Sequence, residues 1–148
     1  MRGIVFALGL ILPALALAQN KAEYVGGTAP QMRIGAEGSI QVDDDHYFAF
    51  YSKKAHVRVE YEHINLIEYG QQVSRRVAIA VIISPLFMLS KSRKHFLTVG
   101  YTGEDGKQQA LVFRVDKNDI RATLVSLEAR TGLKVEYQDP EARKAGKG

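Results

Sequence analysis

Short stretches of strand character separated by turns fill most of the chain, and this pattern restricts the fold more than any other feature. Residues 39–42 and 47–51 lie on either side of three consecutive aspartates at 43–45. Acidic turn residues can hydrogen-bond to their own backbone, so this arrangement predicts a hairpin. Residues 57–61 alternate apolar and polar side chains, which is typical of a half-buried strand.

The following segments continue this pattern. Residues 64–73 indicate a further strand, with Gly70 at a bulge. Residues 96–101 and 110–115 lie on either side of a glycine-containing turn and predict a second hairpin. A long run of antiparallel strands has an apolar face to bury and edges to protect, and closure into a barrel achieves both. We therefore predict a mainly β fold, a partly open antiparallel β-barrel.

One helix is indicated after the strands, over residues 117–131. Apolar residues recur at helical spacing at Ile120, Leu124 and Leu127. Asp116 is expected to cap the helix at its start, and Gly132 to end it. A short final strand is expected over 133–137. A single helix with one apolar stripe suits a C-terminal cap over one open end of the barrel.

The N-terminus has the features of an export signal peptide over residues 1–18. Arg2 supplies a short basic region, an apolar stretch follows over 4–17, and the small-x-small motif that ends at Ala18 fits the cleavage rule. We expect cleavage there and a periplasmic or extracellular location. The alternative is an uncleaved anchor, but the stretch is shorter than the ~20 apolar residues of a membrane span, and Pro13 interrupts it.

The rest of the chain divides into three parts. Residues 19–30 contain glycines and a proline and are expected to form a connecting segment, with an edge strand around Tyr24. Residues 31–138 are expected to form the β-barrel and its helix. Residues 139–148 lack an apolar anchor, which predicts a flexible tail.

Composition limits the chemistry and the partners. The formal net charge of +4 favours anionic partners only weakly. The chain has no cysteine, which excludes disulfides, thiolate catalysis and cysteine-bound metal. Basic residues interleaved with aromatic residues, as in proteins that bind single strands, are not seen, and export also argues against nucleic acid.

The stretch VRVEYEHINLIEYG, residues 57–70, resembles the central motif of bacterial PH-like and GRAM-like domains. In those domains an aromatic–acid pair ends one strand and leads through an isoleucine into the next. The matching positions are Tyr61, Glu62, Ile64 and Ile67. The resemblance extends over residues 31–132 and includes the closing helix. It implies a partly open barrel with a helix over one end, in a class of domains that bind lipids, peptides or proteins and are not usually enzymes.

An apolar run extends from Val77 to Leu89, and only Ser84 and Pro85 interrupt it. As a helix the run would be ~20 Å long, short of the ~30 Å hydrocarbon core, and the proline disfavours helical geometry before it. As a strand, residues 77–83 do not alternate, so both faces would be apolar and the outer face would need a cover. We expect a core strand over 77–83 and an exposed contact loop after it.

The contact loop comprises Leu86, Phe87, Met88 and Leu89. Basic residues flank the run, and those expected to meet anionic lipid are Arg75, Arg76, Lys91, Arg93 and Lys94. This arrangement predicts a non-enzymatic, exported binding module that acts at a membrane surface through residues 77–89. The alternative is a protein-interaction or self-assembly domain, a homo-oligomer included, whose run is covered by a partner chain.

No motif indicates catalysis or a cofactor, and the protein is not expected to be an enzyme. On a strand, Glu60 and Glu62 would share one face and His63 would point to the other, so no metal site is predicted. Tyr69 is expected to be a packed aromatic residue whose hydroxyl is hydrogen-bonded.

Overall fold

The computed structural model describes residues 20–80, 82–83 and 94–147. The predicted signal peptide therefore lies outside the described residues. So do the contact loop 86–89 and two of the flanking cations, Lys91 and Arg93.

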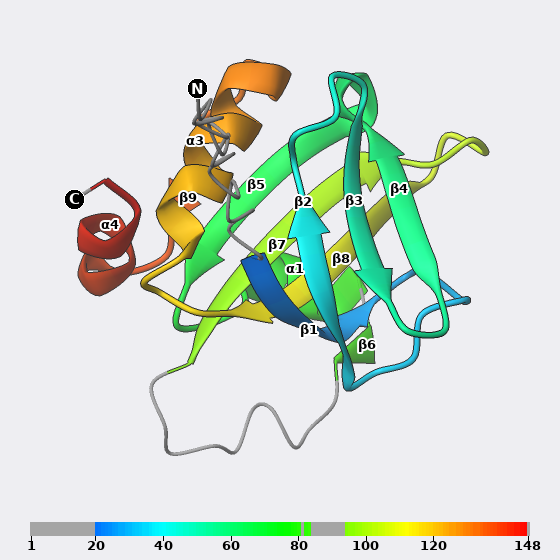
Figure 1. Ribbon diagram of the computed structural model, residues 1–148, viewed down its shortest axis with the longest axis horizontal. Coiled ribbons are helices and arrows are strands. Elements are labelled where there is room, and N and C mark those ends of the chain that lie inside the picture. Colours follow the sequence, from blue (N-terminus) through cyan, green and yellow to red (C-terminus); the bar gives the residue numbers. More distant parts are fainter. Residues whose placement is uncertain (1–19, 81, 84–93, 148) are drawn as a thin grey trace, which may run out of the picture.

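Nine strands, three helices and one short 3-10 turn make up the described chain (Figure 1). The strands are β1 (Asn20–Gly27), β2 (Ala36–Gln41), β3 (Tyr47–Ser52), β4 (His56–Glu60), β5 (Ile64–Gly70), β6 (Ile82–Ile83), β7 (His95–Thr102), β8 (Gln108–Val115) and β9 (Glu136–Tyr137). The helices are α1 (Arg75–Ala80), α3 (Ile120–Thr131) and α4 (Pro140–Lys147), and the turn is η1 (Tyr61–His63). The prediction of a mainly β fold with a C-terminal helix is confirmed.

All strands belong to one sheet, in the order β4-β3-β2-β1-β8-β7-β5-β9, with β6 paired to β1. Both predicted hairpins are present, as β2–β3 and β7–β8. The sheet is not closed into a barrel, contrary to expectation. The reason lies at β5, whose second edge pairs in parallel with β9 through Glu68 and Tyr69. That edge is thus occupied, and β4 connects to β5 only through η1.

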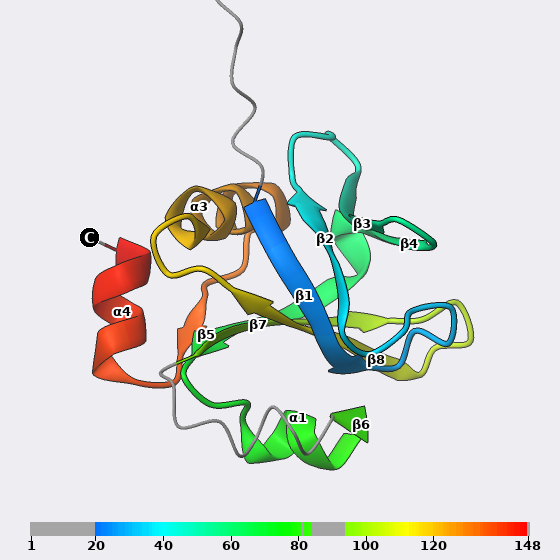
Figure 2. The ribbon, with the colours of Figure 1, turned by 60° about the horizontal axis from the view of Figure 1, so that its bottom comes forward.

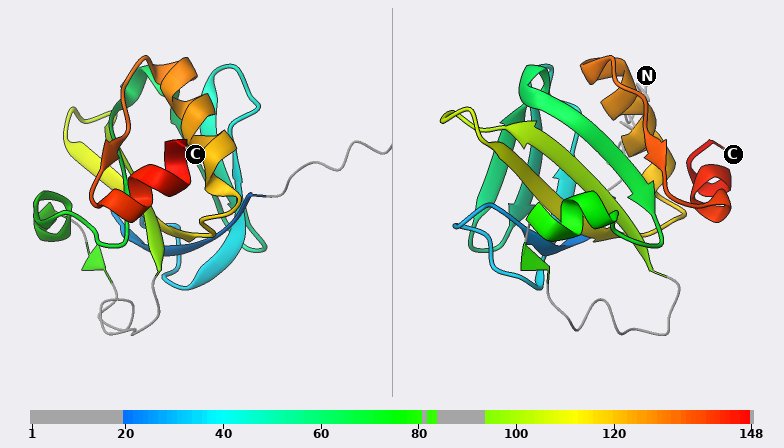
Figure 3. Two further views of the ribbon diagram at one scale, coloured as in Figure 1. Left: turned by 90° about the vertical axis from the view of Figure 1, so that its left-hand side faces the viewer. Right: turned by 180° about the vertical axis from the view of Figure 1, so that it is seen from behind.

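The open sheet bends strongly, so that its two halves face each other around one core (Figure 1). Phe113 of β8 packs against Phe48 and Phe50 of β3, with ring centroids 5.9 and 4.9 Å apart. Helix α3 adds Leu124 and Leu127 to the same core. The predicted helix is therefore present and covers an open side of the bent sheet (Figure 3), although the sheet forms no barrel for it to cap.

The outer face of the sheet is also apolar along β1, β7 and β8. Consecutive β8 residues point to opposite faces, so Phe113 enters the main core while Val112 points outward. A second apolar cluster forms there around Val25, Phe96 and Val112, and Val77 of α1 covers it. Figure 2 shows α1 on the side of the sheet opposite to α3. This half of the sheet is thus buried on both faces.

The expected core strand over residues 77–83 is wrong. Residues 77–80 are part of α1, and only Ile82–Ile83 form a strand. β7 and β8 each already pair with a strand on both sides. A further long strand lying on the outer face would therefore find no backbone groups free for hydrogen bonding. A short helix can cover that face without one.

The two ends of the domain also differ from expectation. Strand β1 is not an edge strand, because it pairs with β2 on one side and β8 on the other. Residues 140–147 are not a flexible tail but helix α4, in which Ala142 is fully buried. Helix α3 begins at Ile120, later than predicted, because Asp116 accepts a hydrogen bond from the backbone N–H of Asn118 in a turn that precedes the helix.

Candidate functional site

The segment between β5 and β7 is an insertion that the sheet does not require. Gly70 at the end of β5 and Phe96 near the start of β7 are register partners in one antiparallel ladder. Such neighbours can be joined by a loop of about 2–5 residues. Residues 71–95 stand there instead, and they contain α1, β6 and the apolar run. The described start of the run stays on the sheet, since Val77 packs against its outer face and Ile82–Ile83 pair with β1.

The predicted lipid-contact cations fall into different environments where the structure describes them. Arg75, the first residue of α1, is exposed. Arg76 donates to Glu68 at 2.9 Å and to Glu136 at 3.0 Å, although its side chain remains 65% exposed. The hydrogen bond to Glu68 raises the pKa of Arg76. Lys94 is half-buried and lines the groove described below.

Glu68 is the buried partner in this ion pair, with only 2% of its side chain exposed. One carboxylate oxygen accepts hydrogen bonds from Arg76 and from the Ser74 hydroxyl. Ser74 directly precedes α1, and Arg76 is the second residue of α1. The buried carboxylate therefore fixes the start of the insertion to the outer face of the sheet.

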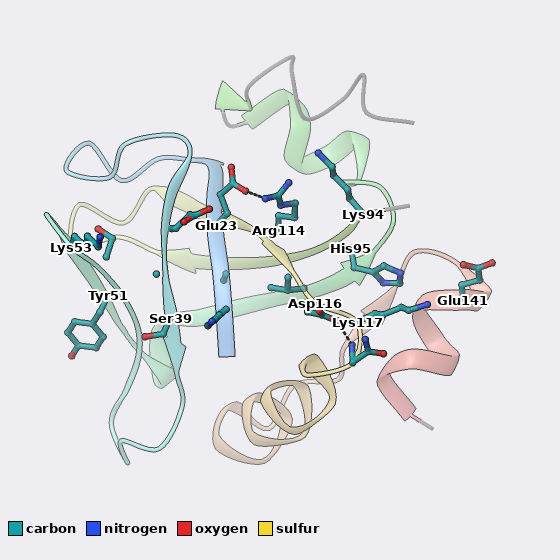
Figure 4. Close-up of a pocket in the computed structure, with 17 residues that line it drawn as sticks. Glu23, Ser39, Tyr51, Lys53, Lys94, His95, Arg114, Asp116, Lys117 and Glu141 are labelled. Atoms are coloured by element: carbon teal, nitrogen blue, oxygen red, sulfur yellow. Dashed lines mark hydrogen bonds and ion pairs between the residues drawn. The ribbon is translucent and has the colours of Figure 1, made fainter. Parts of the chain in front are cut away.

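A polar groove crosses the ends of β1, β2 and β8 and continues towards α3 and α4 (Figure 4). The larger part has a volume of about 1020 Å³, and an adjoining hollow between β7, α3 and α4 has about 570 Å³. His95, Lys117, Asn118 and Glu141 line both parts, so the two are continuous. Sequence reasoning missed this groove, because its lining comes from segments that lie far apart in the chain.

Positive charge predominates in the smaller hollow. Lys117, Arg121 and Lys144 line it, and Glu141 is its only carboxylate among the described residues. Glu141 accepts a hydrogen bond from the Gln71 side chain at 2.6 Å. None of the three cations forms an ion pair with another described residue. The hollow therefore has a surplus of positive charge on exposed side chains.

His95, which lines the groove, forms a buried pair with Tyr69 behind it. The Tyr69 hydroxyl lies 2.7 Å from His95 Nδ1, which confirms the prediction of a packed tyrosine with a bonded hydroxyl. Tyr69 is completely buried and His95 is 5% exposed. Burial raises the pKa of Tyr69 and lowers the pKa of His95. Both side chains are therefore neutral near pH 7. A histidine at the start of an otherwise apolar strand was the available sequence signal for this pair.

Glu60, Glu62 and His63 do not have the strand geometry that was expected from the sequence. Residues 61–63 form η1, so Glu60 and His63 lie on the same side, with His63 Nδ1 3.5 Å from a Glu60 carboxylate oxygen. Glu62 Oε1 lies 4.0 Å from His63 Nε2. The expectation that His63 points away from the two carboxylates is wrong, because a 3-10 turn brings residues i and i+3 together. Glu62 and His63 are exposed, and Glu60 is half-buried.

Comparison with known proteins gave no assignment: no protein-family model and no curated protein matched this chain. Among the helices of the described residues, none has the length and apolar character needed to cross a membrane.

Proposed function

We propose that this protein is an exported, non-enzymatic binding module that acts at an anionic membrane surface. Within residues 77–89, Val77 is buried against the sheet, and residues 86–89 would provide the apolar contact. The flanking cations Arg75, Arg76, Lys91, Arg93 and Lys94 would attract lipid phosphates. The observation that carries this proposal is the insertion between Gly70 and Phe96, since two paired strands need no such long connection.

The fold supports a PH-like or GRAM-like class as part of this proposal. Seven strands follow the order β4-β3-β2-β1-β8-β7-β5, bend around one core and are followed by the covering helix α3. The resemblance at residues 57–70 implied an incomplete barrel with a helix over one end. It also implied binding of lipids, peptides or proteins rather than catalysis.

The energetics fit shallow insertion into a membrane interface. Each large apolar side chain transferred from water contributes roughly 1.5–3 kcal/mol. Loss of rigid-body freedom on association costs ~4–15 kcal/mol, so several such side chains are needed. Residues 86–89 offer four of them, and Arg75 is exposed at the start of α1. Electrostatic attraction by the cations would add to this, and more so at low salt.

Vesicle flotation tests the proposal. We expect the purified protein to float with vesicles that contain phosphatidylglycerol and to remain in the soluble fraction without them. The variant Leu86→Asp with Phe87→Asp should lose this binding. Val125→Asp, which changes an exposed apolar residue on α3, is the matched control and should bind normally. Equal recovery in the soluble fraction with and without vesicles would overturn the proposal.

Light scattering distinguishes the alternative, a protein-interaction or self-assembly domain. We expect a monomer in the absence of lipid. A stable dimer that Leu86→Asp with Phe87→Asp dissociates would show that a second copy of the chain, and not a membrane, covers the run.

Export itself has a direct test. Strand β1 begins at Asn20, so cleavage after Ala18 leaves this central strand intact. Expression of the full chain in a bacterium should give a periplasmic or secreted protein whose N-terminal sequence begins at Gln19. Recovery of the uncut chain in the cytoplasm would contradict export.

A further inference from the structure

The hydrogen bond between Tyr69 and His95 fixes which ring nitrogen of His95 carries the proton. Tyr69 keeps its phenolic proton near pH 7, and that proton requires an acceptor in a buried site. His95 Nδ1, 2.7 Å away, is the acceptor. A neutral imidazole carries one N–H proton, and because Nδ1 accepts, that proton is on Nε2. Within the described part of the chain, the His95 ring makes no other hydrogen bond.

His95 thus offers one N–H donor for which the described residues provide no acceptor. The residue lines both parts of the groove, and Figure 4 shows it beside Lys117. His95 Nε2 is open to the groove rather than buried, so a ligand that accepts from it takes the place of water.

The surrounding charges specify what kind of acceptor fits. Lys117, Arg121 and Lys144 bring three positive charges to the hollow that His95 lines. Glu141 is the one carboxylate that lines it among the described residues, and the carboxylates of Asp116 and Asp139 also act on His95. A monoanionic carboxylate would leave much of this charge uncompensated. A phosphate monoester carries close to two negative charges near pH 7 and has three acceptor oxygens.

We propose that the smaller hollow of the groove binds a phosphate monoester group. His95 Nε2–H donates to one phosphate oxygen, while Lys117, Arg121 and Lys144 supply the compensating charge. A volume of about 570 Å³ admits the phosphate and part of its substituent. The group can belong to a soluble metabolite or to a lipid such as phosphatidic acid, and the two sources share the same chemistry.

Calorimetric titration with glycerol 3-phosphate tests the soluble source, with glycerol as the uncharged comparison. We expect saturable binding of the phosphate ester only. Lys117→Ala combined with Arg121→Ala should weaken it about tenfold or more, because charge-assisted hydrogen bonds are the strong ones. The matched control is Arg33→Ala combined with Lys134→Ala, two exposed cations outside the groove, and it should bind like the natural protein.

The ¹⁵N chemical shifts of the His95 ring test the role of this residue separately. The free protein should show a protonated Nε2, and that signal should move on addition of glycerol 3-phosphate. Tyr69→Phe removes the hydroxyl that donates to His95 Nδ1 and so fixes the tautomer, and it should weaken binding while the fold remains. An unshifted Nε2 signal at saturating ester, or equal affinity in the Lys117→Ala/Arg121→Ala variant, would overturn the proposal.

Vesicles that contain phosphatidic acid distinguish the lipid source. If that lipid is bound through the groove, flotation should weaken in the Lys117→Ala/Arg121→Ala variant while residues 86–89 are intact. Binding of the soluble ester without flotation would support the groove and contradict the membrane proposal. Flotation that depends only on Leu86 and Phe87, with no response to any phosphate ester, would support the membrane and contradict the groove.

Discussion

A buried histidine makes the stability of this protein depend on pH. His95 is 5% exposed, and burial lowers its pKa because the charged ring loses its hydration. Lys117 lowers the pKa further, while the carboxylates of Asp139 and Glu141 oppose the shift. In the unfolded chain the same ring titrates near pH ~6.5. Between the two pKa values the unfolded chain binds the additional proton.

We therefore expect the free energy of unfolding to fall as the pH drops below about 6.5, with a slope of less than one proton for this group. Urea unfolding over a series of pH values measures the slope. His95→Gln should flatten the profile in this window, whatever its effect on stability at pH ~7.5. His46, His56 and His63 are exposed and serve as an internal reference, since they remain in both proteins. An unchanged slope in the variant would contradict this assignment.

Gly38 in β2 is required by close approach rather than by backbone conformation. A Cβ atom at this position would collide with the backbone carbonyl of Tyr51 on β3 and would lie 2.9 Å from the Phe50 ring. Because backbone atoms cannot move aside easily, Gly38→Ala should destabilise the protein by about 1–3 kcal/mol. Chemical denaturation measures the loss. Ser39→Ala, the next residue in the strand, should change stability by less than about 0.5 kcal/mol.

At the scale of elements, α4 depends on small side chains. Ala142 is fully buried, and Gly146 lies against the Tyr137 ring. Asp139 caps the helix by accepting from the backbone N–H of Ala142 at 2.8 Å, and it also accepts from the Gln71 backbone at 2.7 Å. Asp139 thus both caps α4 and connects it to the segment that follows β5.

Ala142→Asp should detach α4, because the new carboxylate would be buried without a partner. Limited proteolysis followed by mass spectrometry should then show rapid cleavage after residue 139, where the natural protein is resistant. Ala122→Asp makes the same change at an exposed position on α3 and should leave the cleavage pattern as it is. Equal protection of both variants would mean that α4 contributes little to the domain.

The elements that could be predicted are those whose signals are local. Alternation along β4, the aspartate turn before β3 and the glycine after α3 each lie within a few residues of the structure that they specify. The open sheet could not be predicted, since it depends on β9 pairing with β5 from a distant part of the chain. Helix α4 did have local signals, an aspartate cap and a proline at its first position, but its anchor is an alanine, which hydropathy does not single out.

The site could be predicted only in part. The apolar run and its flanking cations could be identified from the sequence. The structure places them in a long connection between two strands that are already paired. Arg76 was predicted to contact lipid. Its ion pair with the buried Glu68 could not be predicted, because only the fold brings these two residues together. The same holds for the groove, whose cations come from segments as distant in the chain as β1, β8 and α4. Cations that lie far apart in the chain form no local sequence pattern that would predict such a groove.

At the scale of the whole molecule, two apolar layers lie on opposite faces of one sheet. The inner layer is closed by α3, and the outer layer around Val112 is covered by Val77 of α1. Val77→Asp should uncover the outer layer and lower the free energy of unfolding by about 2 kcal/mol or more. Because exposed apolar sheet faces associate, light scattering should also detect oligomers. Val125→Asp, at a residue that is already 57% exposed, should remain monomeric.

The position of the long insertion also determines what would survive a break in the chain. A single cut between residues 84 and 93 would separate β1–β6 from a second piece that holds β7, β8, α3, β9 and α4. The ladders β5–β7 and β1–β8 both cross between these pieces, and so does the main core. The two fragments should therefore stay together after nicking, and two separately produced halves should reassemble into the complete domain.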